Sequence, residues 1–312
     1  MKTVLITGAG GFIAGHLAVL LKQKGHHVIG VSRSTSRNAE FDKTHTAALG
    51  ETLEPALSEQ PIDAIVHCAN HTGANEYETN VVGTSRWFDE ARAHGVGLQI
   101  LLSSLSAQAD AASEYGRSKF ALENKFKSSG EVAFRLGLVV GNGGMFEQMK
   151  ASQRRFPIVP LLDNGSPRVY VLGIHALCEI LCRCIESRGE SMRGGVWRVQ
   201  QPTPHTLRDV MKSIRNHFRF RCRFFPVSSL PVLWLLMILE RLPLKLPVNS
   251  TNLRGLRAGR FVEFESDFAR FGREEETLDG LVARAASDEV SARERASALH
   301  TGDHTHGRQD TN

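Results

Sequence analysis

The residues best placed to do chemistry lie in the run EYGRSKFALE, where Tyr115 and Lys119 are four positions apart. On a helix this spacing puts both side chains on one face. An unperturbed tyrosine, with a pKa of ~10, is a poor base at neutral pH. An adjacent ammonium group and an oxidised nicotinamide ring both favour the phenolate. The pair therefore predicts acid–base chemistry at a carbonyl or carbinol oxygen, coupled to hydride transfer, with Lys119 also holding the nicotinamide ribose.

A serine upstream completes this predicted reaction centre. The run LLSSLSAQA ends a predicted strand with Ser103 and Ser104, at the carboxyl edge where open parallel sheets bind ligands. Neighbouring residues of a strand point to opposite sides, and we assign Ser104 to the substrate oxygen, with Ser106 as a lesser alternative. The structural alternative is a hydroxyl that only caps the following turn.

A glycine turn near the start of the chain predicts a dinucleotide site. The strand VLIT runs directly into GAGGFIAGHL. Gly8 permits a tight turn, Gly11 lets the backbone approach a pyrophosphate, and Ala14 keeps the first helix close to the sheet. The amides at that helix N-terminus face the anion. The predicted cofactor contacts of this turn are Gly8, Gly10, Gly11, Phe12 and Ile13.

The end of the second predicted strand indicates which dinucleotide is preferred. A carboxylate there would bind the adenosine ribose and repel a 2′-phosphate, but this chain has Ser32 and Arg33. A guanidinium group presents a planar fork that suits phosphate. We therefore predict a preference for NADP(H), with NAD(H) as the alternative, and a solvated surface arginine as the structural alternative for Arg33.

The elements that must position these residues follow from hydrophobic periodicity. Short β-branched runs alternate with amphipathic segments, which predicts a Rossmann-type, doubly wound parallel α/β sheet with a smaller mixed C-terminal lobe. The stretch 34–50 is polar, so the third strand is expected to be short, degenerate or missing. Strands are predicted at 3–6, 28–31, 64–67, 99–102 and 133–140, and helices at 12–24, 76–94 and 114–128.

Three segments make up the predicted domain organisation. Residues 1–141 form the cofactor domain, residues 142–287 form a substrate lobe interwoven with it, and residues 288–312 form a disordered polar tail. In the lobe, helices are predicted near 145–154, at 174–187 and after Thr206, with a strand at 196–199. The apolar run Leu230–Leu246 is interrupted by charges and prolines and is too short for the ~20 residues of a membrane span. It predicts a buried helix or, alternatively, a membrane-surface or lipid-facing segment.

Composition narrows the class of protein further. Of 312 residues, 41% are hydrophobic and 23% charged, which is typical of a globular protein. A net charge of +5 suits a phosphate-bearing ligand or an anionic membrane surface, while scattered arginines argue against nucleic acid. The five cysteines form no paired framework, so we expect free thiols, no metal site and a cytoplasmic protein, with membrane association as the alternative.

Six segments, taken together, carry a resemblance to a known family. TGAGGFIAGHL, DAIVHCAN, NVVGT, LLSSLSA, YGRSK and FRLGLVVGNGG occur in this order and at family-like intervals. Over roughly residues 1–220 the chain resembles the extended short-chain dehydrogenase/reductase family of sugar epimerases, dehydratases and reductases. The resemblance implies that Ser104, Tyr115 and Lys119 are the catalytic triad, that Ala69 borders the cofactor, and that Asn80 supports the site.

The resemblance also implies a substrate and a partner. Arg168 occupies the place where a basic residue meets a substrate diphosphate, and Asn142 is predicted to contact substrate with it. The helices at 76–94 and 114–128 are where such proteins pair into homodimers, although a monomer stays open. Leu105 and Ser106 replace the acidic pair that dehydratases use, so dehydration is not expected.

Three functions remain open at this stage. The first is an NADP(H)-preferring keto-reductase or epimerase of a nucleotide- or polyprenyl-diphosphate-linked sugar. The second is a reductase of a small carbonyl or lipid-like compound, which the apolar run Leu230–Leu246 favours. The third is a cofactor-binding scaffold subunit without turnover, which an intact Ser104, Tyr115 and Lys119 argue against.

Overall fold

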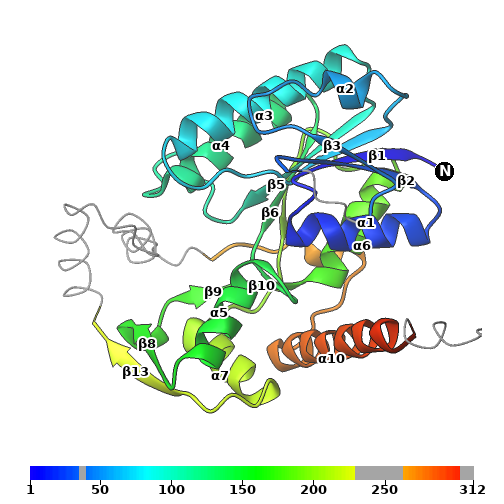
Figure 1. The fold of residues 1–312 in the computed structure, drawn as a ribbon. Helices are drawn as coiled ribbons and strands as arrows, with labels where there is room; N and C mark the ends of the chain where they lie inside the picture. Colours follow the sequence, from blue (N-terminus) through cyan, green and yellow to red (C-terminus); the bar gives the residue numbers. More distant parts are fainter. Residues whose placement is uncertain (35–39, 229–262, 303–312) are drawn as a thin grey trace, which may run out of the picture.

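The computed structural model describes residues 1–34, 40–228 and 263–302 (Figure 1). Within these ranges a parallel sheet has the strand order β11-β6-β5-β4-β1-β2-β3. The predicted Rossmann-type α/β class is therefore confirmed. The strands are β1 (Thr3–Thr7), β2 (His27–Ser32), β3 (Lys43–Thr46), β4 (Ala64–His67), β5 (Leu98–Ser104), β6 (Val132–Leu136) and β11 (Val196–Val199).

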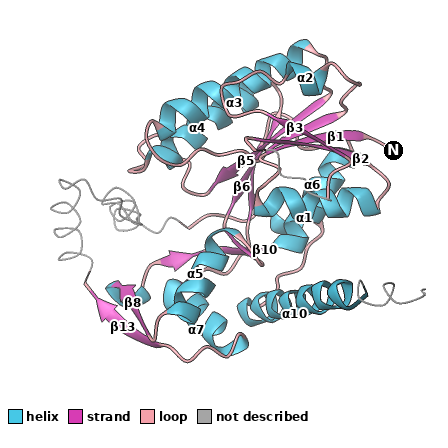
Figure 2. Ribbon diagram, in the orientation of Figure 1, coloured by secondary structure: helices cyan, strands magenta, loops and turns pink. Residues whose placement is uncertain are grey.

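Helices cover both faces of this sheet (Figures 1 and 2). On one face, Val4 and Ile6 of β1 pack into a core with α1 and α6; on the other, Leu5 packs with Trp87 of α3. Both faces of β1 are buried, which explains its continuous apolar sequence. The two helices predicted to form the homodimer face, α3 and α4, pack side by side. The homodimer itself stays a prediction. The helices are α1 (Phe12–Gln23), α2 (Glu54–Leu57), α3 (Glu76–Ala93), α4 (Glu114–Ser128) and α6 (Ile174–Glu186).

The strand order reverses between β1 and β4, and the two strand ends are tied together there. The Thr7 hydroxyl accepts hydrogen bonds from the backbone amides of Cys68 and Ala69, both at 3.2 Å. In open parallel sheets the ligand crevice lies outside the carboxyl ends of the strands at such a reversal. This contact therefore holds the ends of β1 and β4 together beside the glycine turn.

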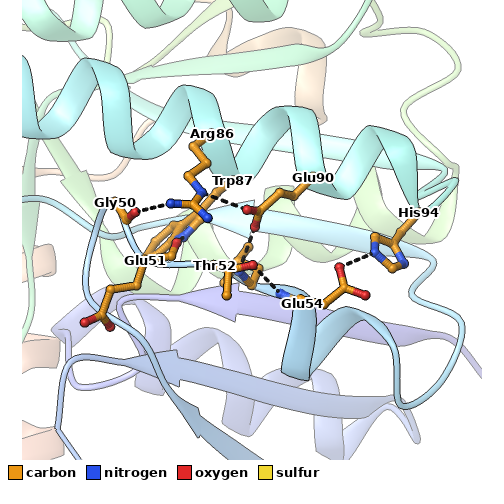
Figure 3. Close-up of polar contacts among 9 residues, drawn as sticks. Gly50, Glu51, Thr52, Glu54, Arg86, Trp87, Glu90 and His94 are labelled. Atoms are coloured by element: carbon orange, nitrogen blue, oxygen red, sulfur yellow. Dashed lines mark hydrogen bonds and ion pairs between the residues drawn. The ribbon is translucent and has the colours of Figure 1, made fainter.

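The third strand is short, as the polar sequence predicted. β3 spans Lys43–Thr46, and the chain after it lies along α3. The Arg86 guanidinium donates to the carbonyl of Gly50 at 2.7 Å, and the Trp87 indole donates to the carbonyl of Glu51 at 2.7 Å (Figure 3). Side chains of α3 thus hold the chain that follows β3, the edge strand that the local sequence pattern predicts poorly.

The predicted strand at 133–140 is in fact two strands that belong to different sheets. β6 ends at Leu136, and β7 (Leu138–Val140) pairs instead with β10 (Val171–Gly173) in the second lobe. At Gly137 between them, a Cβ atom would lie 2.5 Å from the Tyr170 carbonyl oxygen. The sequence does not reveal this change of partner strand. A glycine in a strand indicates that another backbone approaches closely, but not which one.

The chain returns twice from the second lobe to the cofactor domain, once at α6 and once at β11. The predicted helices near 145–154, at 174–187 and after Thr206, and the predicted strand at 196–199, are all confirmed. However, α6 packs on α1 and β11 pairs with β6, so both elements complete the cofactor domain. The lobe itself consists of α5 (Gly144–Arg155), β7, β8 (Ile158–Leu162), β9 (Arg168–Val169), β10, β12 (His205–Thr206), α7 (Leu207–His217), β13 (Arg223–Val227) and α10 (Leu278–Gly302).

The prediction of a disordered tail from residue 288 is wrong as far as Gly302, where α10 ends. An ion pair and a hydrogen bond hold this stretch: the Lys150 ammonium contacts the Glu289 carboxylate, and His175 Nε2 lies 2.8 Å from Asp288 Oδ2. These partners come from α5 and α6. Local polarity could not reveal them, and residues 303–312 lie outside the described ranges.

Within the described ranges, no helix has both the length and the apolar character that crossing a bilayer requires. The apolar run Leu230–Leu246 lies outside those ranges, so its predicted role stays a prediction.

A buried ion pair fixes α4, the helix of Tyr115 and Lys119, to the sheet. Glu123 is 2% exposed. Its carboxylate accepts hydrogen bonds from Arg135 Nε at 2.9 Å and Nη2 at 2.6 Å, and from the Ser103 hydroxyl at 2.5 Å. One side chain of α4 is thereby joined to both β5 and β6.

We expect Glu123→Gln to lower the free energy of unfolding by about 3 kcal/mol, because Arg135 would keep its charge in a buried site without a counter-ion. Urea denaturation measures this. A matched control is Lys125→Gln, which removes the exposed ion pair with Asp89 and should cost under about 1 kcal/mol. Equal losses in the two variants would contradict the interpretation.

Candidate active site

A cavity of about 960 Å³ lies at the carboxyl edge of the large sheet. Its walls come from the loops after β1 and β4, from the end of β5, from the first turns of α4, and from β7, β9 and α5 of the second lobe. The described residues that line it are Phe12, Ile13, Cys68, Asn70, Leu102–Ser106, Gln108, Tyr115, Lys119, Leu136–Val139, Gly144, Met145, Asp163, Ser166–Tyr170 and Phe264.

The start of α4 directs the reaction centre into this cavity. Ser113 caps the helix, its hydroxyl accepting from the Gly116 amide at 3.1 Å. A Cβ atom at position 116 would lie 2.5 Å from the Ser106 carbonyl oxygen, so glycine lets α4 approach the loop after β5. This close approach brings Tyr115 of α4 to Ser104 of β5.

Alternation along β5 separates the two serines, as predicted. The Ser103 hydroxyl donates to Glu123 on the α4 side at 2.5 Å. The Ser104 hydroxyl instead lies in the cavity wall, hydrogen bonded to Tyr115 and, at 2.9 Å, to the Ser106 hydroxyl. The structure therefore brings Ser104 to the tyrosine and also places Ser106, the lesser alternative, within reach of the same oxygen.

Lys119 is buried beside the tyrosine. Its ammonium group donates to the carbonyl of Leu102 at 3.0 Å and lies 5.6 Å from the centroid of the Tyr115 ring. Burial lowers the pKa of Lys119 to about 8, although nearby acidic groups oppose this. The cation that the reaction needs is thus close to losing its proton at mildly alkaline pH.

The protein groups by themselves do not lower the pKa of Tyr115, and the predicted joint effect of Lys119 and an oxidised nicotinamide stays a prediction. Burial raises the pKa of Tyr115, and the hydrogen bond to Ser104 only partly opposes it. The physical reason is that burial disfavours the phenolate more than the surrounding side chains stabilise it. At neutral pH the tyrosine is therefore held as the protonated phenol, which is the form of a proton donor.

The glycine turn fits a dinucleotide pyrophosphate. Gly8 has φ +71°, and a Cβ atom there would lie 2.9 Å from the Cα of Ala69. Gly11 is the N-cap of α1, whose first turn has neither a capping side chain nor an acidic residue, so its amides are available to an anion. Next to the turn, Phe12 and Ile13 line the cavity, whereas Gly10 has open space above its Cα.

The other residues predicted to contact the cofactor lie in different parts of the structure. Ser32 ends β2, Arg33 follows it, and neither lines the cavity. Residues 35–39 beside them are not described, so the NADP(H) preference stays a prediction. Asn80 is a positioning residue: its amide oxygen accepts from the amide of His71 at 2.8 Å, and its Nδ2 donates to the His71 and Glu76 carbonyls at 2.8 Å. It shapes the loop after β4 that borders the cavity.

Of the two residues predicted to contact substrate, one lines the cavity and the other does not. Arg168 of β9 lines the cavity in the wall formed by the second lobe. Asn142 does not: its Nδ2 donates to the carbonyl of Ala285 at 2.8 Å, and its Oδ1 accepts from Lys150 at 3.0 Å. The substrate assignment of Asn142 is corrected to an anchor for α10, because both ends of its amide are used by Lys150 of α5 and Ala285 of α10.

Several site residues were not anticipated from the sequence. Tyr170 and Phe264 line the cavity from the second lobe and are joined, since the Phe264 amide donates to the Tyr170 hydroxyl at 3.1 Å. No local pattern connects these two positions. Glu123 had a usable signal, because it lies four residues after Lys119 on the same helix face.

Comparison with known proteins agrees with this geometry. Residues 4–135 match the model of the NAD dependent epimerase/dehydratase family, which confirms the predicted resemblance for this part of the chain. The description of that family as NAD dependent agrees with the prediction of a nicotinamide-dependent oxidoreductase. The match ends inside β6, so the second lobe is outside it.

Individual relatives are distant. The chain is 27% identical over 115 residues to a 2-alkyl-3-oxoalkanoate reductase of Stenotrophomonas maltophilia, a match that spans 33% of this chain and 33% of that protein. It is 29% identical over 132 residues to a UDP-glucose 4-epimerase of Klebsiella pneumoniae, covering 34% of this chain and 92% of the relative. The fold resembles the structure of UDP-glucose 4-epimerase with UDP-glucose from Thermotoga maritima, with TM-score 0.68, 15% identity, and 93% and 99% of the two chains covered.

The lowered pKa of Lys119 predicts a pH dependence for cofactor affinity. NADPH binding should weaken as pH rises through about 8, because Lys119 loses the charge that holds the nicotinamide ribose. Lys119→Arg keeps its charge throughout and should move this loss to higher pH. Fluorescence titration of NADPH between neutral and alkaline pH tests this, and an identical profile for both proteins would contradict it.

Proposed function

We propose that the protein is an NADP(H)-preferring reductase or epimerase that acts on a keto or carbinol carbon of a nucleotide- or polyprenyl-diphosphate-linked sugar. One observation carries the proposal: a single cavity contains Ser104, Tyr115 and Lys119 on the side of the large sheet and Arg168 on the side of the second lobe. The first group serves proton transfer, and the guanidinium suits a diphosphate.

The residues of the cavity divide the reaction between them. The nicotinamide cofactor, when bound, donates or accepts the hydride. In the direction of reduction, the Tyr115 phenol gives its proton to the carbonyl oxygen, and Ser104 donates a hydrogen bond to that oxygen. The ammonium group of Lys119 stabilises the phenolate that is left until it takes a proton from solvent. Burial raises the pKa of Tyr115, so the phenol carries its proton at neutral pH and can act as the donor.

Two features favour net reduction within this class. Arg33 favours NADP(H), which exchanges at each turnover, whereas an epimerase commonly retains NAD. Leu105 and Ser106 line the cavity directly after Ser104, and of the described lining residues only Asp163 carries a carboxylate. Abstraction of a proton at a neighbouring carbon, as dehydration requires, therefore has no acidic pair to support it.

A second candidate is a reductase of an apolar carbonyl compound. The observation that favours it is the hydrophobic wall around the reaction centre, which includes Leu105, Leu136, Leu138, Met145 and Phe264. Such side chains recognise alkyl groups by excluding water. The partial match to a 2-alkyl-3-oxoalkanoate reductase points the same way.

Cofactor preference is tested by equilibrium titration of NADPH and NADH. We expect tighter binding of NADPH, with a loss of roughly tenfold or more in Arg33→Ala, because a charge-assisted hydrogen bond to phosphate is removed. NADH affinity serves as the control and should not change. Retained NAD without NADPH preference would favour an epimerase, and binding of neither dinucleotide would favour a scaffold subunit.

The substrate class is tested with UDP as a probe for a nucleoside diphosphate. UDP should bind the complex with NADPH, and Arg168→Ala should weaken it by roughly tenfold or more. Arg223→Ala, which removes an exposed arginine of the same lobe outside the cavity, is the matched control. UDP affinity that is unchanged in Arg168→Ala would favour the apolar carbonyl substrate.

A further inference from the structure

One end of the second lobe presents an apolar sheet face to solvent. β8 and β13 form a parallel pair in which Ile158 lies opposite Arg223 and Pro160 lies opposite Phe225. Ile158 and Phe225 are each 60% exposed. Figure 1 places this pair at the far end of the lobe from β1 and β2. We call this region the tip surface. It consists of the exposed face of β8 and β13, of Arg154, Arg155 and Phe156 at the end of α5, and of Arg219 and Arg221 before β13.

The opposite face of the same strands is already used. Val159 and Leu161 alternate with the exposed residues of β8 and pack into a core with Met211 and Cys222. A two-sided sheet of this kind normally has polar residues on its solvent side. Packing within the described lobe therefore does not account for Ile158 and Phe225.

The charge around these apolar side chains has a single sign. Arg154, Arg155, Arg219, Arg221 and Arg223 are exposed, while residues 148–162 and 210–228 contain neither aspartate nor glutamate. Within the described part of the chain, no carboxylate forms an ion pair with any of these arginines. Among the described residues their positive field is consequently not neutralised by an ion pair, and it favours an anionic partner.

We propose that the tip surface docks on the surface of an anionic lipid bilayer. Exposed Phe156, Ile158 and Phe225 can enter the boundary between headgroups and acyl chains, as the apolar faces of peripheral proteins do. The surrounding guanidinium groups then contact lipid phosphates. Single-stranded nucleic acid would stack its bases on aromatic rings, which Phe156 and Phe225 offer but Ile158 and Pro160 do not, so it uses only part of the apolar surface.

This surface is separate from the reaction centre but belongs to the same lobe as one wall of the cavity. β8 ends at Leu162, and the next residue, Asp163, lines the cavity. Docking at the tip would therefore hold the cavity near the membrane whatever the substrate is. The proposal does not depend on the proposed function and uses described residues only.

Co-sedimentation of the full chain with vesicles tests the proposal. We expect binding to vesicles of phosphatidylcholine mixed with phosphatidylglycerol, weakening with added salt, and little binding to phosphatidylcholine alone. Arg221→Glu with Arg223→Glu should weaken binding by at least about tenfold, since each basic residue near an anionic surface contributes roughly fivefold. Ile158→Ser with Phe225→Ser should weaken it by about tenfold through lost apolar contact.

The matched control carries the same charge reversal on the opposite lobe, Arg92→Glu with Lys127→Glu, and should bind like the parent. NADPH affinity in every variant reports whether the fold is intact. Vesicle binding that survives both tip double variants would overturn the proposal, as would equal binding to both vesicle types. Tighter binding of a single-stranded oligonucleotide than of the vesicles, or a dimer that only the tip variants dissociate, would overturn it in favour of those partners.

Discussion

The attachment of one helix, α4, to the end of β5 is the constraint on which the reaction centre depends. Glu123 pairs with Arg135 and Ser103, and Lys119 donates to the carbonyl of Leu102. These contacts orient the helix so that Tyr115 meets Ser104. The same burial that makes the contacts strong also lowers the pKa of Lys119 and raises the pKa of Tyr115. Structural attachment and acid–base chemistry are thus two effects of one desolvated environment.

The cavity combines two chemically different parts. Its inner end, at β5 and α4, is polar and carries the groups that move a proton. Its outer walls come from the second lobe, where Leu138, Met145, Val169 and Phe264 are apolar and Arg168 is charged. A substrate that satisfies all of them has a reactive carbonyl or carbinol, an apolar stretch and an anionic group. Diphosphate-linked sugars and alkyl-bearing carbonyl compounds each meet part of this description. The fold is compatible with both substrate classes, so measurements of substrate binding distinguish them better.

The second lobe is tied to the cofactor domain by elements that cross between them. α6 packs on α1, β11 extends the large sheet, and α10 is anchored by Lys150, Asn142 and His175. The second lobe is therefore held to the cofactor domain by packing and polar contacts, whereas at the tip of the lobe Ile158 and Phe225 are exposed to solvent. A rigid cavity beside an exposed, cationic and apolar surface is an arrangement suited to chemistry close to an interface.

The amino-acid sequence by itself determined the elements whose signals are local. The glycine turn at Gly8 and Gly11, the Tyr115 and Lys119 spacing and the alternation that selects Ser104 over Ser103 each depend on residues a few positions apart, where backbone geometry fixes the outcome. Tertiary structure decided what depends on distant partners. It divided the run at Gly137 between two sheets, continued α10 to Gly302, assigned Asn142 to Lys150 and Ala285, and raised rather than lowered the pKa of Tyr115. Burial and long-range hydrogen bonds set these properties, and neither can be read from neighbouring residues.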